Sequence, residues 1–308
     1  MALTTAPFTA ADLVAMISET WTPVVLNEMF AKGVAQNFFT DLSPYAVEGS
    51  DIFHVPDLFT NAHSVSSQST HGAEVTTSSP TQVDVTLTVD SHRYIALLVG
   101  DMLQAQLNKN YDLVGETAKK VVGTLVENTE DAFFALHSSI TTNTVNDTAS
   151  VLDDTSIRQA VEKLATADVN LSECAFFLHP YAYWVQVIQI AKYYDASQAG
   201  WGGNNPIPTG NFGPASPATG LVGQLFGIPI YQSSRVVNSL NSTKNLLAHK
   251  NTIGFAFQTP GGGPIRVRAQ EWLENLGILT VFDLIRGVGI LRQGVGVVLN
   301  ASNAFIAS

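Results

Sequence analysis

A long polar stretch between two strand-like runs constrains the fold of this chain more than any other feature. Residues 61–80 are almost wholly Ser, Thr, His, Gly and Gln. Before it, residues 52, 53 and 55 are apolar. After it, the run 82–90 alternates polar and apolar residues strictly, which is the period of a strand with one buried face. The pattern predicts a long hairpin whose tip has no core. Because an isolated two-stranded hairpin is only marginally stable in water, we expect its apolar face to rest on a neighbouring subunit.

The apolar residues of this hairpin are the candidate contacts with that neighbour. They belong to an arm that lacks a core of its own, and exposed apolar surface of this kind is typical of a protein–protein contact. The candidates are Phe53, Leu58, Phe59, Val83, Val85 and Leu87. Charged substitutions at Val85 and Leu87 are expected to block assembly more than they unfold the subunit.

Helical periodicity accounts for the N-terminal residues and for the middle of the chain. Thr9 is placed to cap a helix over about residues 10–20, and Pro23 to begin a second helix that ends near residue 32. The two short helices form an N-terminal arm. From residue 112 to 140, apolar residues recur every three or four positions. This spacing predicts one long helix of about 40 Å at 1.5 Å per residue.

The second half of the chain mixes helices with short strands. Thr155 is expected to cap a helix, the apolar run 175–178 to form a buried strand, and His179 with Pro180 to begin another helix. A surface loop rich in Gly, Asn, Pro and Ser is expected over 195–220. Strands should follow at 228–232, 245–248, 253–258, 265–270, 276–284 and 288–299. The fold class is therefore α+β, with most of the last half in sheet.

Charge and hydropathy narrow the function classes. The chain has 308 residues and a net charge of −11, from 15 Lys and Arg against 26 Asp and Glu, and it has no run of basic residues. Strong DNA binding needs basic residues that displace counterions from phosphates, so sequence-specific recognition of nucleic acid is not expected. No apolar stretch approaches the roughly 20 residues that cross a bilayer as a helix, and the N-terminus lacks the positive segment of a secretion signal. We expect the protein in the cytosol or in a particle, with no membrane partner.

Cysteine and histidine give no strong signal for a metal site. The single cysteine, Cys174, precedes an apolar run and cannot form an intramolecular disulfide or a cysteine zinc cluster, so a buried, inert thiol is expected. Four of the seven histidines lie at positions 54, 63, 71 and 92, without the usual ligand spacing. Exposed polar histidines explain them better than a metal site does. At subunit contacts, these histidines would make assembly sensitive to pH at about pH 6.

No motif argues for an enzyme. The common phosphate-loop, zinc-protease and serine-hydrolase signatures are missing from the sequence, and the glycines at 261–263 lack the lysine of a phosphate loop. Glu127 and Asp131 lie one helical turn apart, but a solvated helix face explains them more simply than acid–base chemistry. Asp153 and Asp154 at a helix start favour the helix dipole. We therefore expect no catalytic, cofactor-binding or metal-binding residues.

Two segments and the order of the elements resemble a known family. The segment from Gly220 to Val236 contains Gly227-Ile-Pro229-Ile, similar to the family's loop, G-x-P-V and x-S stretch. The run from Glu271 to Val298 is similar to its closing strands. Together with the N-terminal arm, the hairpin, the long helix and the α/β core, these segments resemble the major capsid proteins of tailed phages, which have the Hong Kong 97-like fold. The resemblance spans nearly the whole chain.

The resemblance implies five parts in an α+β Hong Kong 97-like fold. They are an N-terminal arm (1–49), an extended hairpin loop (50–95), a peripheral domain with a long spine helix (96–149), an axial domain (150–254), and C-terminal strands shared between both domains (255–308).

The function that the resemblance implies is structural. The subunit would assemble as hexamers and pentamers into the icosahedral head of a tailed phage, with scaffolding, portal and decoration proteins as partners. The head would hold its double-stranded DNA without sequence-specific contacts. Assembly would take place in the host cytoplasm, and the protein would end in the virion.

Some family members cross-link their subunits through a lysine of the extended loop. This chain has no lysine between Lys32 and Lys109, so we expect no such cross-link. It also starts directly with the arm, so scaffolding would be a separate protein or a removed segment.

Two alternatives stay open. An encapsulin shell has a similar fold but encloses protein cargo, and Leu13, Met16 and Ile17 would then lie at its cargo site. A soluble hydrolase is the last alternative, although its motifs are missing.

Overall fold

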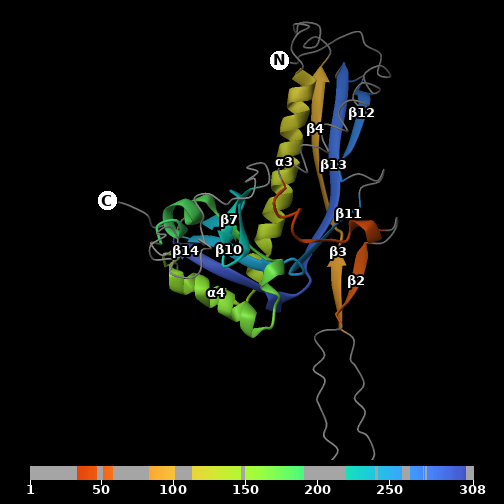
Figure 1. Ribbon diagram of the computed structural model, residues 1–308. Helices are drawn as coiled ribbons and strands as arrows, with labels where there is room; N and C mark the ends of the chain where they lie inside the picture. The colour runs from red at the N-terminus through yellow and green to blue at the C-terminus, as the bar shows by residue number, and fades with distance from the viewer. Residues whose placement is uncertain are drawn as a thin grey trace, which may run out of the picture.

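The computed structural model describes residues 33–46, 51–57, 83–100, 113–146, 150–190, 220–239, 242–258, 264–272, 274 and 276–302. They form a seven-stranded sheet, a five-stranded sheet and a two-stranded arm. Figure 1 shows the long helix α3 (Leu113–Ala135) lying along the five-stranded sheet, with the seven-stranded sheet beside the lower end of the helix. The expected N-terminal helices, the hairpin tip, the loop at 195–219 and the glycines at 261–263 fall outside the described residues.

The seven-stranded sheet, which we call the body sheet, is buried on both faces. Its central strand β6 (Cys174–Leu178) pairs antiparallel with β10 (Ser242–His249) and parallel with β8 (Ile228–Gln232). Around these three strands lie β5 (Thr144–Val145), β14 (Gly296–Ser302), β7 (Leu221–Leu225) and β9 (Asn238–Ser239). All five residues of β6 are buried, so the predicted strand at 175–178 is confirmed.

The strand period divides the side chains of β6 between two apolar clusters. Phe176 and Leu178 pack with helix α4 (Asp154–Thr166) on one face of the body sheet. Phe177 points to the opposite face and joins aromatic residues of α3 and of the segment 33–39. A strand that is covered on both faces has no polar side to alternate, which explains its continuous apolar run.

The five-stranded sheet, which we call the elongated sheet, is built around the long strand β13 (Gly277–Ile290). β13 pairs antiparallel along one side with β4 (Ser91–Gly100) and along the other with β12 (Arg266–Trp272) and β11 (Ile253–Phe257), which also pairs with β1 (Thr40–Asp41). One face packs on α3 through an apolar cluster of Ala118, Val121, Val122, Leu125, Val126, Ile265, Ile278, Phe282 and Leu284. None of the helices in the described ranges is long and apolar enough to cross a membrane.

The sequence placed a strand break between residues 284 and 288, and this prediction is wrong. β13 runs without interruption to Ile290, and the next strand begins at Gly296 after a 3-10 turn (Gln293–Val295). The glycine at 287 marks close packing and not a turn. A Cβ atom on Gly287 would lie 2.4 Å from the carbonyl oxygen of Thr88.

Three predicted helix features also change. The long helix ends as an α-helix at Ala135 and continues as a 3-10 turn (Leu136–Ser139). The cap of α4 is Asp153, whose carboxylate accepts a hydrogen bond from the main-chain nitrogen of Ser156 at 2.7 Å, and not Thr155. The helix expected after Pro180 is a short π-helix (Ala182–Val187).

Candidate interaction site

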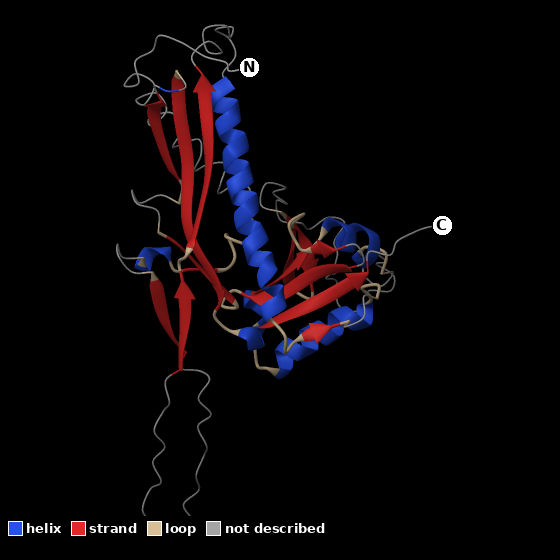
Figure 2. Ribbon diagram, turned by 180° about the vertical axis from the view of Figure 1, so that it is seen from behind, coloured by secondary structure: helices blue, strands red, loops and turns tan. Residues whose placement is uncertain are grey.

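The candidate contact residues lie on the two-stranded arm. β2 (Ile52–Asp57) and β3 (Val83–Thr88) pair antiparallel, with Phe53 opposite Leu87 and Val55 opposite Val85. Because residues two apart share a face of a strand, these four side chains form one apolar stripe. Figures 1 and 2 show the arm extending away from both larger sheets.

The base of the arm has a small core of its own. Leu87 is 2% exposed and packs with Val89 and Ala256. Phe53 packs against this cluster, as do Leu42 and Ile285. The side chain of Leu87 therefore has almost no exposed surface in the described subunit. The intersubunit contact expected at this residue stays a prediction. The sequence did not reveal this core because Ala256 and Ile285 come from strands far along the chain.

The apolar stripe continues beyond this core. Val55 and Val85 are only half-buried, and they belong to none of the apolar clusters formed by the described residues. Leu58 and Phe59 lie outside the described residues. Val83 lies in β3, but its side chain is outside the description. Val55 and Val85 are therefore the described residues of the apolar stripe that keep surface for contact with another molecule. On the opposite face of the arm, Ile52 is 41% exposed.

The arm is acidic. Five carboxylates fall between residues 51 and 90, and neither Lys nor Arg occurs between residues 33 and 92. On the face opposite the apolar stripe, His54 lies 3.8 Å from Asp84, and both side chains are largely exposed. Among the described residues, no group of three or more metal-ligating side chains comes together. His63 and His71 lie outside the description.

The face of the elongated sheet that points away from α3, which we call the outer face, combines exposed apolar side chains with arginines. Tyr94, Leu98 and Trp272 are 66%, 46% and 38% exposed. The strand register places all three on the same face as Asp283 and Arg266. Large exposed apolar side chains on one face of a sheet are typical of a contact surface.

A buried carboxylate organises the polar part of the outer face. Asp283 has no exposed side-chain surface and binds Arg266 through both oxygens, at 3.0 and 2.5 Å. His92 lies 3.1 Å and Arg268 3.4 Å from the same carboxylate. Burial alone would raise the pKa of Asp283, but the hydrogen bonds from Arg266 and His92 outweigh burial and hold the pKa below its ordinary value. No sequence pattern singled out this residue.

The carboxylates of Glu127 and Asp131 serve a structural contact. Arg235, in the turn after β8, forms an ion pair with Glu127 and lies 3.8 Å from Asp131. All three side chains are partly exposed, so each pair contributes at most about 1 kcal/mol. The ion pairs join α3 to the body sheet, which the sequence could not predict because Arg235 is more than 100 residues away from its partners.

Cys174 fits the sequence-based prediction. Its side chain is buried in the cluster between the body sheet and α4. Burial raises the pKa of the thiol to about 11. The reactive thiolate is therefore scarce at neutral pH.

No family model matches the sequence, and no curated protein matches it. The structure of Mycobacterium phage Che8 is similar with a TM-score of 0.66 and 16% identity, covering 87% of this chain and 91% of that chain. The mature capsid of bacteriophage PhiM1 gives a TM-score of 0.64 and 14% identity, covering 87% of both chains.

An encapsulin complex from Synechococcus elongatus is also similar, with a TM-score of 0.57 and 15% identity over 89% of both chains. Two of these three structures are a phage capsid and an encapsulin complex. The predicted α+β fold is confirmed, and the chain has the Hong Kong 97-like fold of tailed-phage capsid subunits.

Proposed function

We propose that this chain is the major capsid protein of a tailed phage, a subunit that assembles into the icosahedral shell around a double-stranded DNA genome. The observation that carries the proposal is a phage-capsid fold over almost the whole chain. It is combined with an arm whose apolar stripe extends beyond the small core at its base. A surface of this kind suits a subunit that completes its packing in a symmetric assembly. The net charge of −11 gives the wall no general affinity for DNA.

Val55 and Val85 would form the centre of the contact that the arm makes with a second copy. The predicted contacts Phe53, Leu58, Phe59 and Val83 belong to the same proposal, with Phe53 at the edge of the arm's own core. Charge favours the outer face of the elongated sheet as the partner surface, because the arm has carboxylates and no Lys or Arg, whereas the outer face presents Arg266 and Arg268. Complementary charge of this kind fixes the orientation of two partners.

The two larger sheets support the proposed division into domains. The elongated sheet with α3 corresponds to the peripheral domain, and the body sheet with α4 to the axial domain. The last described strands serve both, because β11, β12 and β13 pair in the elongated sheet and β14 pairs in the body sheet. Scaffolding, portal and decoration proteins belong to the proposal as partners, and the virion as the location.

The substitution Val85→Asp tests the proposal. It places a charge on the apolar stripe, where a desolvated carboxylate would oppose the contact with a second copy. Thr86→Asp is the matched control, because Thr86 is exposed on the opposite face of the same strand. We expect particles from the wild type and from Thr86→Asp, and only dissociated, folded subunits from Val85→Asp, by light scattering and negative-stain microscopy. Normal particles from Val85→Asp would refute the proposed contact.

The contents of the particle distinguish a phage head from an encapsulin. A phage head is expected to carry double-stranded DNA when it is isolated from phage-producing cells, whereas an encapsulin encloses protein. Nuclease-protected DNA inside the shell supports the capsid function. A small shell that contains a single protein species and no DNA would overturn it.

A further inference from the structure

Glu130 of α3 is a buried carboxylate that binds two other parts of the chain. Its side chain is 4% exposed. Oε1 accepts hydrogen bonds from the main-chain nitrogens of Val34 at 2.5 Å and Ala35 at 2.8 Å. Oε2 accepts a hydrogen bond from the hydroxyl of Ser233 at 2.7 Å. One side chain thus meets the segment 33–39 with one oxygen and the turn after β8 with the other.

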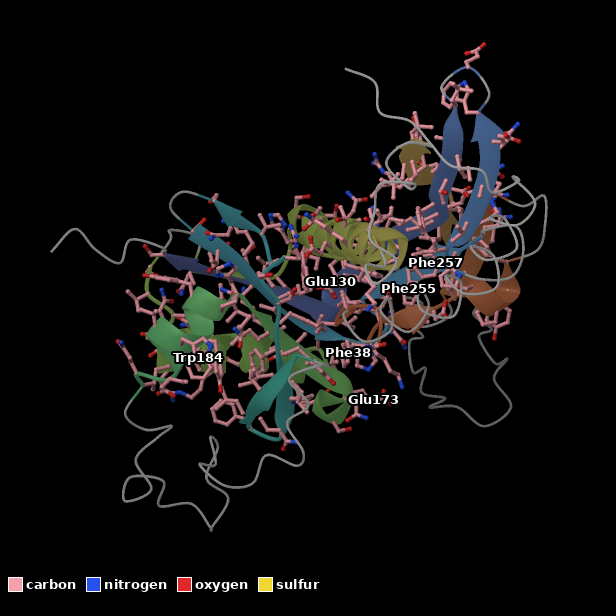
Figure 3. All side chains as sticks on the ribbon, turned by 90° about the horizontal axis from the view of Figure 1, so that it is seen from above. Phe38, Glu130, Glu173, Trp184, Phe255 and Phe257 are labelled. Atoms are coloured by element: carbon pink, nitrogen blue, oxygen red, sulfur yellow. The ribbon has the colours of Figure 1, made fainter. Side chains whose placement is uncertain are left out.

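The position of this carboxylate is a junction. Figure 3 shows Glu130 on α3 between the two larger sheets. The segment 33–39 leads into β1 of the elongated sheet, and Ser233 follows directly after β8 of the body sheet. Val34 also touches the body sheet at Gly220, where an added Cβ atom would lie 2.8 Å from Cγ2 of Val34. Glu130 therefore lies where α3 and both sheets come together.

The three hydrogen bonds depend on one another. A buried carboxylate is stable only while its oxygens have donors, and an oxygen that loses its donor carries the full cost of desolvation. If the body sheet moves and Ser233 withdraws, the carboxylate must rotate or admit water to recover a donor. Either response disturbs the bonds to Val34 and Ala35, although Ser233 touches neither residue in any hydrogen bond of the described structure.

We propose that Glu130 is a latch that couples the position of the body sheet to the segment 33–39. In the closed latch, Val34 and Ala35 are held by α3 while Ser233 holds the other oxygen. Loss of either side loosens the other.

The latch needs one side-chain oxygen that accepts two hydrogen bonds, from the main-chain nitrogens of Val34 and Ala35. It does not need a negative charge. Burial raises the pKa of Glu130, against the hydrogen bonds from Ala35, Ser233 and Val34, which lower it. The charged side chains at the junction are Glu127 and Asp131 on α3 and Arg235 in the turn, and the segment 33–39 contributes none. A glutamine could accept from both main-chain nitrogens through its oxygen and donate its amide to Ser233. Glu130→Gln is therefore expected to keep the latch closed, and Glu130→Ala to open it.

Hydrogen exchange of single main-chain amides in the full chain tests the coupling. Ser233→Ala removes one donor from the latch and no apolar contact of the segment 33–39. We expect the amides of Val34 and Ala35 to exchange roughly tenfold faster in Ser233→Ala than in the wild type. Thr129→Val is the control, because Thr129 is a buried neighbour on α3 whose hydroxyl donates within the helix, to the carbonyl of Leu125 at 2.8 Å. This variant should leave the two amides unchanged.

The variants at position 130 give the second test. Exchange at Val34 and Ala35 in Glu130→Gln is expected to stay within about threefold of the wild type. The proposal fails if Ser233→Ala accelerates exchange only around residue 233, or if Glu130→Gln exposes the two amides as Ser233→Ala does. Because Glu130→Ala can fail to fold, the decision rests on the milder Ser233→Ala and Glu130→Gln. Failure of the latch would leave the shell function untouched, since that function is tested by particle formation.

Discussion

The body sheet and the arm bury their apolar residues in different ways. β6 in the body sheet is covered on both faces, by α4 on one side and by aromatic residues of α3 and the segment 33–39 on the other. The arm has one apolar stripe, and only its base, at Phe53 and Leu87, is covered within the subunit. The body therefore has a core of its own, whereas the proposed function has the arm complete its packing against a second molecule. Stability and assembly should respond to different residues of one chain.

The largest loss of stability is expected at the centre of the body. Phe177 is fully buried, with ring centroids 5.2 Å from Phe39 and 5.6 Å from Tyr231 in stacked geometry. Phe177→Ala should lower the free energy of unfolding by about 3–5 kcal/mol, because it removes a buried aromatic ring and leaves a cavity. Urea unfolding of dissociated subunits measures the change. Trp184→Ala is the control, since Trp184 is 59% exposed and should cost about 0.5 kcal/mol or less. Equal losses at both positions would contradict a self-sufficient body core.

Leu87 and Val85, two residues apart on β3, distinguish the base of the arm from its outer part. Leu87→Ala should lower the free energy of unfolding by about 2–4 kcal/mol, since Leu87 is buried within the subunit. Val85→Ala should cost less than about 1 kcal/mol in the dissociated subunit, because its side chain is only half-buried. The same urea titration gives both values. If Val85→Ala costs as much as Leu87→Ala, then the arm is covered within the subunit and the contrast with the body disappears.

A smaller loss of stability is expected where the base of the arm packs closely on the elongated sheet. Gly287→Ala would place a Cβ atom 2.4 Å from the carbonyl oxygen of Thr88, where a main-chain atom must move. We expect a loss of about 2–3 kcal/mol in unfolding free energy. Gly294→Ala is the matched control, because a Cβ atom there meets nothing within 4 Å. A tolerated Gly287→Ala would mean that the arm can shift on the sheet, and thermal unfolding of both variants distinguishes the outcomes.

The spacing of apolar residues along the chain was enough to predict several helices and strands of this fold. The buried strand at 175–178, the long helix and the alternating strand at 83–88 follow from the period of their apolar residues. The break predicted at 285–287 lies inside β13, where Gly287 packs closely against the main chain of Thr88. The capping residue of α4 was missed by two positions because Asp153 and Thr155 are both good caps.

The polar contacts between distant segments could not be read from the sequence. Glu130 meets Val34 and Ser233, which lie 96 and 103 residues away, and His92 meets Asp283 across 191 residues. Such pairs are set by how the sheets register against each other, and a single sequence contains no signal for that. The base of the arm was missed for the same reason, since Leu87 packs with Ala256 from β11.

The smallest effect on stability is expected at the outer face of the elongated sheet, where Asp283 is held by a polar cluster and not by aromatic packing. The pKa of Asp283 is lowered in the folded state. Its stabilising contribution is therefore complete above the unfolded pKa of about 3.9 and is lost as the pH falls through the lower folded value. Asp283→Asn should cost about 1–2 kcal/mol at pH 7, because it weakens charge-assisted hydrogen bonds from Arg266 and His92.

The difference in unfolding free energy between the wild type and Asp283→Asn should then shrink below about pH 4. Urea unfolding at several pH values between about 3 and 7 measures it. Asp90→Asn, at an exposed carboxylate, is the control for the loss of one carboxylate from the chain. A constant difference between the wild type and Asp283→Asn would mean that charge at Asp283 adds nothing to the elongated sheet. Both the body sheet and the elongated sheet would then be stabilised by apolar packing alone. They would differ only in the share of that packing that lies within one subunit.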